Sequence, residues 1–232
     1  KAFSSLIDLH PTHKSVPYAL VQRAIAYQTQ KKLAEAERDF SDLIRKWPKA
    51  AKERELALQQ KALIRGQMND NTGMAENFQI LLRDYPKSPA AAQAHYWIGW
   101  AAFEAKDYKK AAEHLAQART LDAKEFFEKA SLRAMLSHYY LEDVDKTARE
   151  VDLYVKEGKG KVPVEVLRWL GEALVKRNAP QQAEKYLGQL ATRDEVLPRD
   201  LLLLGQSRSK AQQYPAAIEA FQAYLTKVKE PP

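Results

Sequence analysis

The stretch AQAHYWIGWAAFEAKDYKKAAEHLAQARTLDAK, residues 92–124, decides the fold of this chain. Its apolar residues recur at the spacing of one helix face, which predicts a helix over Ala92–Ala105 and a second over Lys109–Thr120. The segment between them, Lys106-Asp107-Tyr108, is so short that it predicts a tight turn. Two amphipathic helices joined by such a short turn pack antiparallel against each other.

Small residues stand where the two predicted helices must cross. Gly99 in the first helix and Ala111 in the second leave room for a close approach of the two backbones. Bulkier side chains flank them, with Ile98 beside the glycine and Leu115 one turn after the alanine. The sequence therefore predicts a helix pair that nests on small residues and is sealed by large ones.

The same arrangement recurs along the chain at an almost constant interval. Asp8-Leu9-His10-Pro11, Arg45-Lys46-Trp47-Pro48 and Arg83-Asp84-Tyr85-Pro86 place their prolines 37 and 38 residues apart (48 − 11 and 86 − 48). Proline cannot continue a helix and disfavours helix for the residue before it, so each of these segments predicts a helix end. A fixed period in this range is typical of stacked helical repeats.

This spacing predicts a single solenoid of successive repeats over residues 1–232. We interpret the chain as a fragment of a longer protein. Residues 1–16 match the end of a truncated repeat. Met74 takes the second small position of its repeat, so that copy is expected to be looser. The repeat at 129–161 lacks clear small positions and ends in Gly158-Lys159-Gly160-Lys161, where we expect a long loop. The predicted repeats are 17–50, 55–88, 92–125, 129–161 (degenerate), 164–197 and 198–231.

The clearest copy, 92–125, resembles the tetratricopeptide repeat, which has small residues at its eighth and twentieth positions and bulky ones at positions 7, 24 and 27. In this chain Gly99 and Ala111 occupy the two small positions. The resemblance implies an all-α fold, a right-handed superhelical solenoid of antiparallel helix pairs. It also implies that the first helix of each pair lines a concave groove.

A finer resemblance comes from the ends of the repeats. Arg83-Asp84-Tyr85-Pro86-Lys87-Ser88-Pro89, followed by Ala94 to Gly99, looks like the repeats of bacterial cell-envelope proteins. Relatives of this kind are the periplasmic coordinator of the Tol–Pal system and the repeat lipoprotein of the outer-membrane β-barrel assembly machine. The likeness covers mainly residues 36–120. It implies a periplasmic or outer-membrane-associated protein of a Gram-negative-type bacterium, and a cytoplasmic location is the alternative.

Composition excludes several kinds of chemistry. The chain has no cysteine, which rules out disulfides and thiolate catalysis. Its formal charge is +7, but 37 basic residues are interspersed with 30 acidic ones, so no nucleic-acid partner is expected. No apolar run is long enough for a transmembrane segment. His10 and His13 lack further ligands at metal-binding spacing, and no catalytic motif occurs, so we expect no metal, no cofactor and no enzyme.

The predicted solenoid favours partner binding as the function, because a solenoid offers a long continuous surface. Trp97, Trp100 and Trp169 are the strongest candidate anchors, because tryptophan buries a large area at interfaces. The other interpretation is that these residues pack as core between neighbouring helices. The predicted groove positions are Tyr18, Gln22, Ile25, Gln60, Leu63, Gln93, Trp97, Trp100, Glu104, Trp169, Glu172 and Lys176.

The sequence thus predicts a non-catalytic scaffold that binds a protein or peptide on its concave face, in a bacterial cell envelope. Two alternatives remain open at this point. The chain could be a self-assembly module, in which an exposed apolar edge or the groove itself buries against a second copy. It could also be a regulatory segment of a larger protein whose catalytic domain lies elsewhere.

Overall fold

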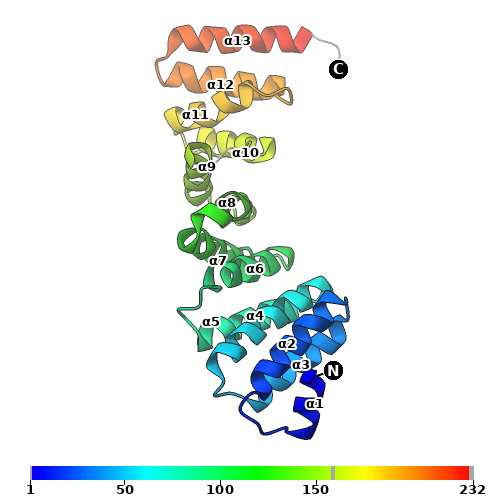
Figure 1. Cartoon of the computed structure of the whole chain (residues 1–232). Coiled ribbons are helices and arrows are strands. Elements are labelled where there is room, and N and C mark those ends of the chain that lie inside the picture. Colours follow the sequence, from blue (N-terminus) through cyan, green and yellow to red (C-terminus); the bar gives the residue numbers. More distant parts are fainter. Residues whose placement is uncertain (1, 158–159, 230–232) are drawn as a thin grey trace. The chain divides into compact units, whose positions relative to one another are not determined.

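The computed structural model describes residues 2–157 and 160–229, and these are helical with short connections (Figure 1). The all-α fold class is confirmed, with thirteen helices in the described residues and no strand among them. Their bounds are α1 Ala2–Leu9, α2 Val16–Thr29, α3 Leu33–Lys46, α4 Ala51–Gln67, α5 Asn71–Asp84, α6 Ala91–Glu104, α7 Tyr108–Leu121, α8 Ala123–Tyr140, α9 Val144–Glu157, α10 Val164–Lys176, α11 Pro180–Ala191, α12 Pro198–Lys210 and α13 Tyr214–Lys229.

Successive helices form antiparallel pairs, as the repeat spacing predicts. The predicted helices at 92–105 and 109–120 correspond to α6 and α7 within one residue at each end. Each pair from α2/α3 to α12/α13 turns through one residue with a positive φ, which is how a helix commonly ends. These residues are Lys31, Asn69, Lys106, Glu142, Asn178 and Gln212, with φ between 55° and 62°.

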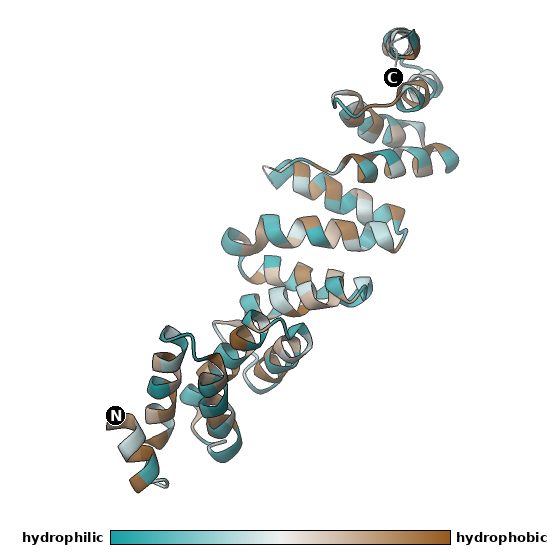
Figure 2. Ribbon diagram, turned by 90° about the vertical axis from the view of Figure 1, so that its right-hand side faces the viewer, coloured by the Kyte–Doolittle hydropathy of each residue, from teal (hydrophilic) through white to brown (hydrophobic). Residues whose placement is uncertain are grey.

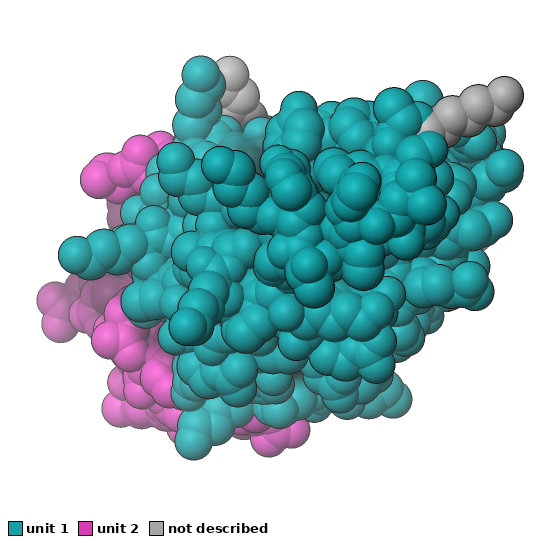
Figure 3. Space-filling model, turned by 60° about the horizontal axis from the view of Figure 1, so that its bottom comes forward, with its two compact units in different colours: residues 1–133 teal, residues 134–232 magenta. Residues whose placement is uncertain are grey.

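The chain divides by its contacts into two compact units, residues 1–133 and residues 134–232, with the division inside α8 (Figure 3). In the first unit each helix from α1 to α7 packs on the next, and α2 also contacts α4. In the second unit the helices from α9 to α13 include the closely packed pairs α10/α11 and α12/α13. A single superhelical solenoid over 1–232 stays a prediction.

Small residues lie buried at the helix crossings. Ala24 and Ala36 are fully buried in the α2/α3 pair, and so is Ala111 in the α6/α7 pair. A β-carbon on Gly99 would lie 2.8 Å from the Leu115 Cγ atom and 3.2 Å from the Ala111 carbonyl oxygen. The two backbones therefore approach as closely at this crossing as the sequence predicts.

The repeat at 55–88 has a large residue at the position where its two helices cross. Met74 is buried at the position where other copies have a small residue. Opposite it stands Gly66, whose absent β-carbon would lie 2.8 Å from the Met74 sulfur. The large side chain is thus accommodated by a glycine on the facing helix.

The proline segments end helices where expected. Helices α1, α3 and α5 end at Leu9, Lys46 and Asp84, each two residues before the proline of its segment. Hydrophobic and hydrophilic residues alternate along the helices (Figure 2), consistent with one face of each helix turned to its neighbours.

The helix that enters the degenerate repeat starts before the predicted repeat boundary. The spacing predicts that this repeat begins at Lys129, and α8 begins at Ala123. Asp122 accepts a hydrogen bond from the Glu125 backbone N–H at 3.1 Å and so caps the earlier start. Phe126 is buried and its ring lies 5.1 Å from that of Tyr96 in α6. The loop expected at 158–161 lies partly outside the described residues.

The close crossing of α6 and α7 leads to a stability prediction. Gly99→Val adds atoms where the α7 backbone leaves no space, so it should cost about 1–3 kcal/mol. For a chain of this size each kcal/mol lowers the melting temperature by about 2–4 °C, which thermal melts followed by circular dichroism would detect.

Gly188→Ala is the matched control. Gly188 is also helical, but its added β-carbon would have its nearest neighbour at 3.5 Å. Alanine should raise stability there by about 0.5–1 kcal/mol. Equal effects of the two substitutions would contradict the proposed role of the close crossing.

Candidate functional site

The first helices of the pairs in the first unit lie beside one another and are linked by glutamine side chains. Gln28 in α2 donates to the Gln60 side-chain oxygen in α4 at 3.4 Å. Gln59 in α4 donates to the Gln93 side-chain oxygen in α6 at 2.8 Å. We call the sides of α2, α4 and α6 that carry the predicted groove residues the first-helix face.

Two tryptophans dominate this face on α6. The rings of Trp97 and Trp100 are 5.7 Å apart and meet edge to face at 77°. Both side chains are partly buried, since they pack against the apolar cluster that α4, α5 and α6 share. They are therefore fixed on one side by the core and accessible on the other.

The remaining predicted residues of the first unit range from partly buried to exposed. On α2, Tyr18 is 55% exposed with the Phe3 ring edge-on at 6.4 Å, and Ile25 is 38% exposed. Gln22 is partly buried. On α4, Leu63 packs partly buried against the apolar cluster. These side chains leave polar and apolar atoms open to a partner along the first-helix face.

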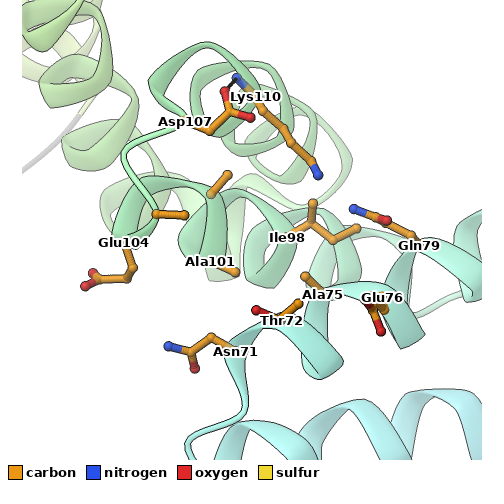
Figure 4. A pocket seen from close by; sticks show the side chains of 12 residues that line it. Asn71, Thr72, Ala75, Glu76, Gln79, Ile98, Ala101, Glu104, Asp107 and Lys110 are labelled. Carbon is orange, nitrogen blue, oxygen red and sulfur yellow. Dashed lines mark hydrogen bonds between the residues drawn. The ribbon is translucent and has the colours of Figure 1, made fainter.

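Two hollows lie at the ends of α6. One, of about 440 Å³, lies between the starts of α4 and α6, and Leu56, Gln59, Gln93 and Phe126 are among the residues that line it. The other, of about 490 Å³, lies between the start of α5 and the end of α6, and Glu104 is part of its wall (Figure 4). Both volumes are within the range of pockets that take a ligand or a few side chains.

The second unit holds the other three predicted residues, on α10. The Trp169 ring stands at 88° to that of Tyr139 in α8, with 5.3 Å between the ring centroids. Glu172 pairs with Arg199 of α12 at 3.4 Å, and Lys176 is exposed. This unit thus presents its own aromatic pair with charged neighbours.

The sequence interpretation missed several residues of these surfaces. Gln59 is not among the predicted groove positions, although it pairs with the predicted Gln93. The two residues stand at positions 5 and 2 of their repeats, so no repeat position pointed to their pairing. Tyr139 lies in the degenerate repeat, so no repeat position pointed to it. The hollow at the end of α6 depends on small side chains of two different repeats, which no single-repeat pattern reveals.

A pair of histidines joins α6 and α7 away from these hollows. The Nδ1 atoms of His95 and His114 are 3.0 Å apart, so one ring donates a hydrogen bond to the other. Burial lowers the pKa of both, and for His114 to about 4, with His95 and Lys110 adding to the effect. Both rings are therefore neutral near pH 7.

Other kinds of site lack the necessary groups in the part of the chain that the structure describes. No cluster of three or more histidine or carboxylate side chains that could hold a metal ion occurs among these residues. None of the described helices combines the length and apolarity that crossing a membrane requires.

Comparison with known proteins finds a similarity to one family of helical repeats over two segments of the chain. Two family models, each described as tetratricopeptide repeat, match residues 18–50 and 60–126. The solved structure of YrrB, described as a TPR protein with an unusual peptide-binding site, is similar with a TM-score of 0.59 and 12% identity, covering 96% of this chain and 98% of that one. A tetratricopeptide repeat protein from Parabacteroides merdae is similar with a TM-score of 0.53 and 14% identity, covering 97% and 84%. No curated protein matches the chain.

The histidine pair predicts a dependence of stability on pH. The folded-state pKa of His114, about 4, lies below the ordinary value of 6.5, so its contribution is present above pH 6.5 and is lost as the pH falls from 6.5 toward 4. Through this group the unmodified chain should lose folding stability on the order of 1–3 kcal/mol between pH 7.5 and pH 4.5. The His114→Gln protein should not show this loss, which thermal melts at the two pH values would measure.

The exposed His10 offers the control substitution. His10→Gln should leave the pH dependence of the melting temperature as it is in the unmodified chain. If His114→Gln also leaves it unchanged, the coupling between this pair and stability is refuted.

Proposed function

Because the chain carries tetratricopeptide repeats and its described residues fold as helix pairs of that kind, we propose that it is a non-catalytic scaffold for a protein or peptide partner. The partner binds on the first-helix face of the first unit. The observation that carries this proposal is the edge-to-face pair Trp97 and Trp100, held by the core on one side and partly accessible on the other.

The chemistry of this face suits a polypeptide. Partly buried tryptophans give a partner large apolar area without the entropic cost of ordering a loose side chain. The bonded glutamines, Gln59 with Gln93 and Gln28 with Gln60, place amide donors and acceptors on the same face. Amide groups of this kind can form hydrogen bonds with a peptide backbone.

The absence of catalysis is part of the proposal. Proteins built of tetratricopeptide repeats typically bind other proteins or peptides and do not catalyse reactions. The similar YrrB structure is described as having a peptide-binding site. That description supports partner binding by analogy only, because the identity is 12%.

The second unit carries a further proposed contact surface, formed by Trp169, Glu172 and Lys176. Trp169 rests on Tyr139, and the ion pair between Glu172 and Arg199 fixes one edge of this patch.

We further propose that the protein works in a bacterial cell envelope. The support is the likeness of the segment Arg83-Asp84-Tyr85-Pro86-Lys87-Ser88-Pro89 to envelope repeat proteins. Fractionation of cells that express the tagged full-length gene should find the protein with the periplasm or outer membrane. Recovery with the cytoplasmic marker would contradict this location.

Substitution of Trp100 tests the binding face. Peptides selected from a random display library on the immobilised chain should bind Trp100→Ala about tenfold or more weakly, since this ring is the proposed anchor. Because Trp100 is only partly buried, the loss of stability should stay below the ~3–5 kcal/mol of a fully buried aromatic deletion.

Trp47→Ala is the matched control, since Trp47 is also partly buried but packs on the α2/α3 side, away from Trp97 and Trp100. It should keep the affinity of the selected peptides, measured by fluorescence anisotropy. Equal affinity for the Trp100→Ala and Trp47→Ala proteins would refute the assignment of the face.

A further inference from the structure

The hollow at the end of α6 corresponds to a place that an arginine fills elsewhere in this chain. Counted from the first residue of their predicted repeats (55, 92 and 198), Arg65, Ala102 and Arg208 all stand at the eleventh position. Each lies on a first helix, on the side turned to the preceding pair. The three junctions that these residues occupy, α3/α4, α5/α6 and α11/α12, can therefore be compared position by position.

At the junction of α3 and α4, the arginine is held by two carboxylates. Arg65 donates from Nε to Glu37 Oε1 at 2.7 Å and from Nη1 to Asp70 Oδ2 at 2.7 Å. Glu37 is at position 21 of the preceding repeat and Asp70 is at position 16 of the same repeat. Asp70 also caps α5 by accepting from the Gly73 backbone N–H at 2.8 Å.

The junction of α11 and α12 repeats this arrangement in the second unit. Arg208 donates from Nε and Nη2 to Glu184 Oε1, both at 3.2 Å. Glu184 again stands at position 21 of the preceding repeat. The remaining Nη1 group donates to the Ala216 carbonyl at 3.1 Å. An arginine at position 11 thus fills the space between consecutive pairs in both units.

The junction of α5 and α6 lacks this pair but keeps the carboxylate. Ala102 replaces the arginine and Ala75 replaces the glutamate at position 21. Both alanines line the 490 Å³ hollow, so the space that the ion pair fills elsewhere is open here. Asp107 stands where Asp70 stands, at position 16, and uses one oxygen to cap α7 by accepting from the Lys110 backbone N–H at 3.2 Å.

Acidic side chains and small or apolar ones, among them Ala75, Ala101 and Ile98, line this hollow (Figure 4). Glu76, Glu104 and Asp107 line it together with one cation, Lys110. In the described residues no lysine or arginine forms an ion pair with any of these three carboxylates. The hollow therefore combines the room for an arginine with an excess of negative charge, in a chain whose net charge is +7.

We propose that this hollow binds an arginine side chain of the partner. A guanidinium presents five donors in a planar fork that matches carboxylate oxygens, and its aliphatic stem packs on small apolar residues. The free Asp107 oxygen corresponds to the Asp70 oxygen that Arg65 contacts in the previous junction. Lys110 competes for the same carboxylates, so it weakens the binding of a guest cation. This inference rests on the proposed function and adds the chemistry of one partner residue.

The test uses the full chain, labelled with ¹⁵N, and blocked glycine–serine heptapeptides that differ only at their central residue. A peptide with central arginine should shift the amide signals of residues around the hollow, such as Thr72, Ala102 and Lys110. The peptide with citrulline, which keeps the shape and loses the charge, should bind about tenfold more weakly or worse. Equal binding of the arginine and citrulline peptides, or of a lysine peptide, would overturn the proposal.

Substitutions test whether the arginine peptide binds in this hollow. Ala102→Arg supplies the missing arginine within the chain, so it should abolish the shifts and raise the melting temperature. Glu104→Gln should weaken binding, and Lys110→Gln should strengthen it. Glu113→Gln is the control, since Glu113 is exposed on α7 and does not line the hollow. Shifts that persist in Ala102→Arg would overturn the site.

Failure of this inference can be separated from failure of the proposed function. If the arginine peptide causes no shift while library peptides still bind in a Trp100-dependent way, the hollow is not an arginine site and the binding face stands. If library peptides bind without dependence on Trp100 while arginine still fills the hollow, the assignment of the face fails and the arginine site stands.

Discussion

The close crossing of two helices on small side chains is the constraint on which this structure depends. At Gly99 one more carbon would lie 2.8 Å from the Leu115 side chain and 3.1 Å from the nearest backbone atom of α7. Alanines at the crossings of other pairs, such as Ala24 and Ala36, are completely buried. Such contact gives many weak attractions that no larger residue could replace without moving a helix. Each pair is therefore a rigid element, and the first helix keeps one side free of the pair's own packing.

The junctions between pairs are less constrained, and there the sequence can vary. At the three junctions compared above, position 21 carries Glu37 or Glu184 where the next pair supplies an arginine, and Ala75 where the next pair supplies Ala102. At the junction of α5 and α6, two alanines stand in place of the ion pair, and a hollow is open at the end of α6. A repeat protein can in this way keep the same fold in each helix pair while the side chains between consecutive pairs form different binding sites.

Much of the fold could be predicted because its determinants are local. The prolines after α1, α3 and α5, and the small residues at Gly99 and Ala111, act within one repeat and fix helix ends and crossings. Other features depend on pairs of distant residues. The space for Met74 comes from Gly66, and the early start of α8 comes from Phe126 packing on Tyr96. The hollow needs Ala75 and Ala102 together, so a reading of single repeats could not find it.

The predicted binding residues show the same division. The resemblance to the tetratricopeptide repeat implied groove positions at Trp97, Trp100 and Glu104 on α6. The ring geometry and the hollows at the ends of α6 follow only from the packing of α4, α5 and α6. If the paired helices leave their first-helix face to a partner, hydrogen exchange should detect the partner on that face. A library-selected peptide should add protection in α4 and α6. Protection gained mainly in α3 and α7 would refute binding on the first-helix face.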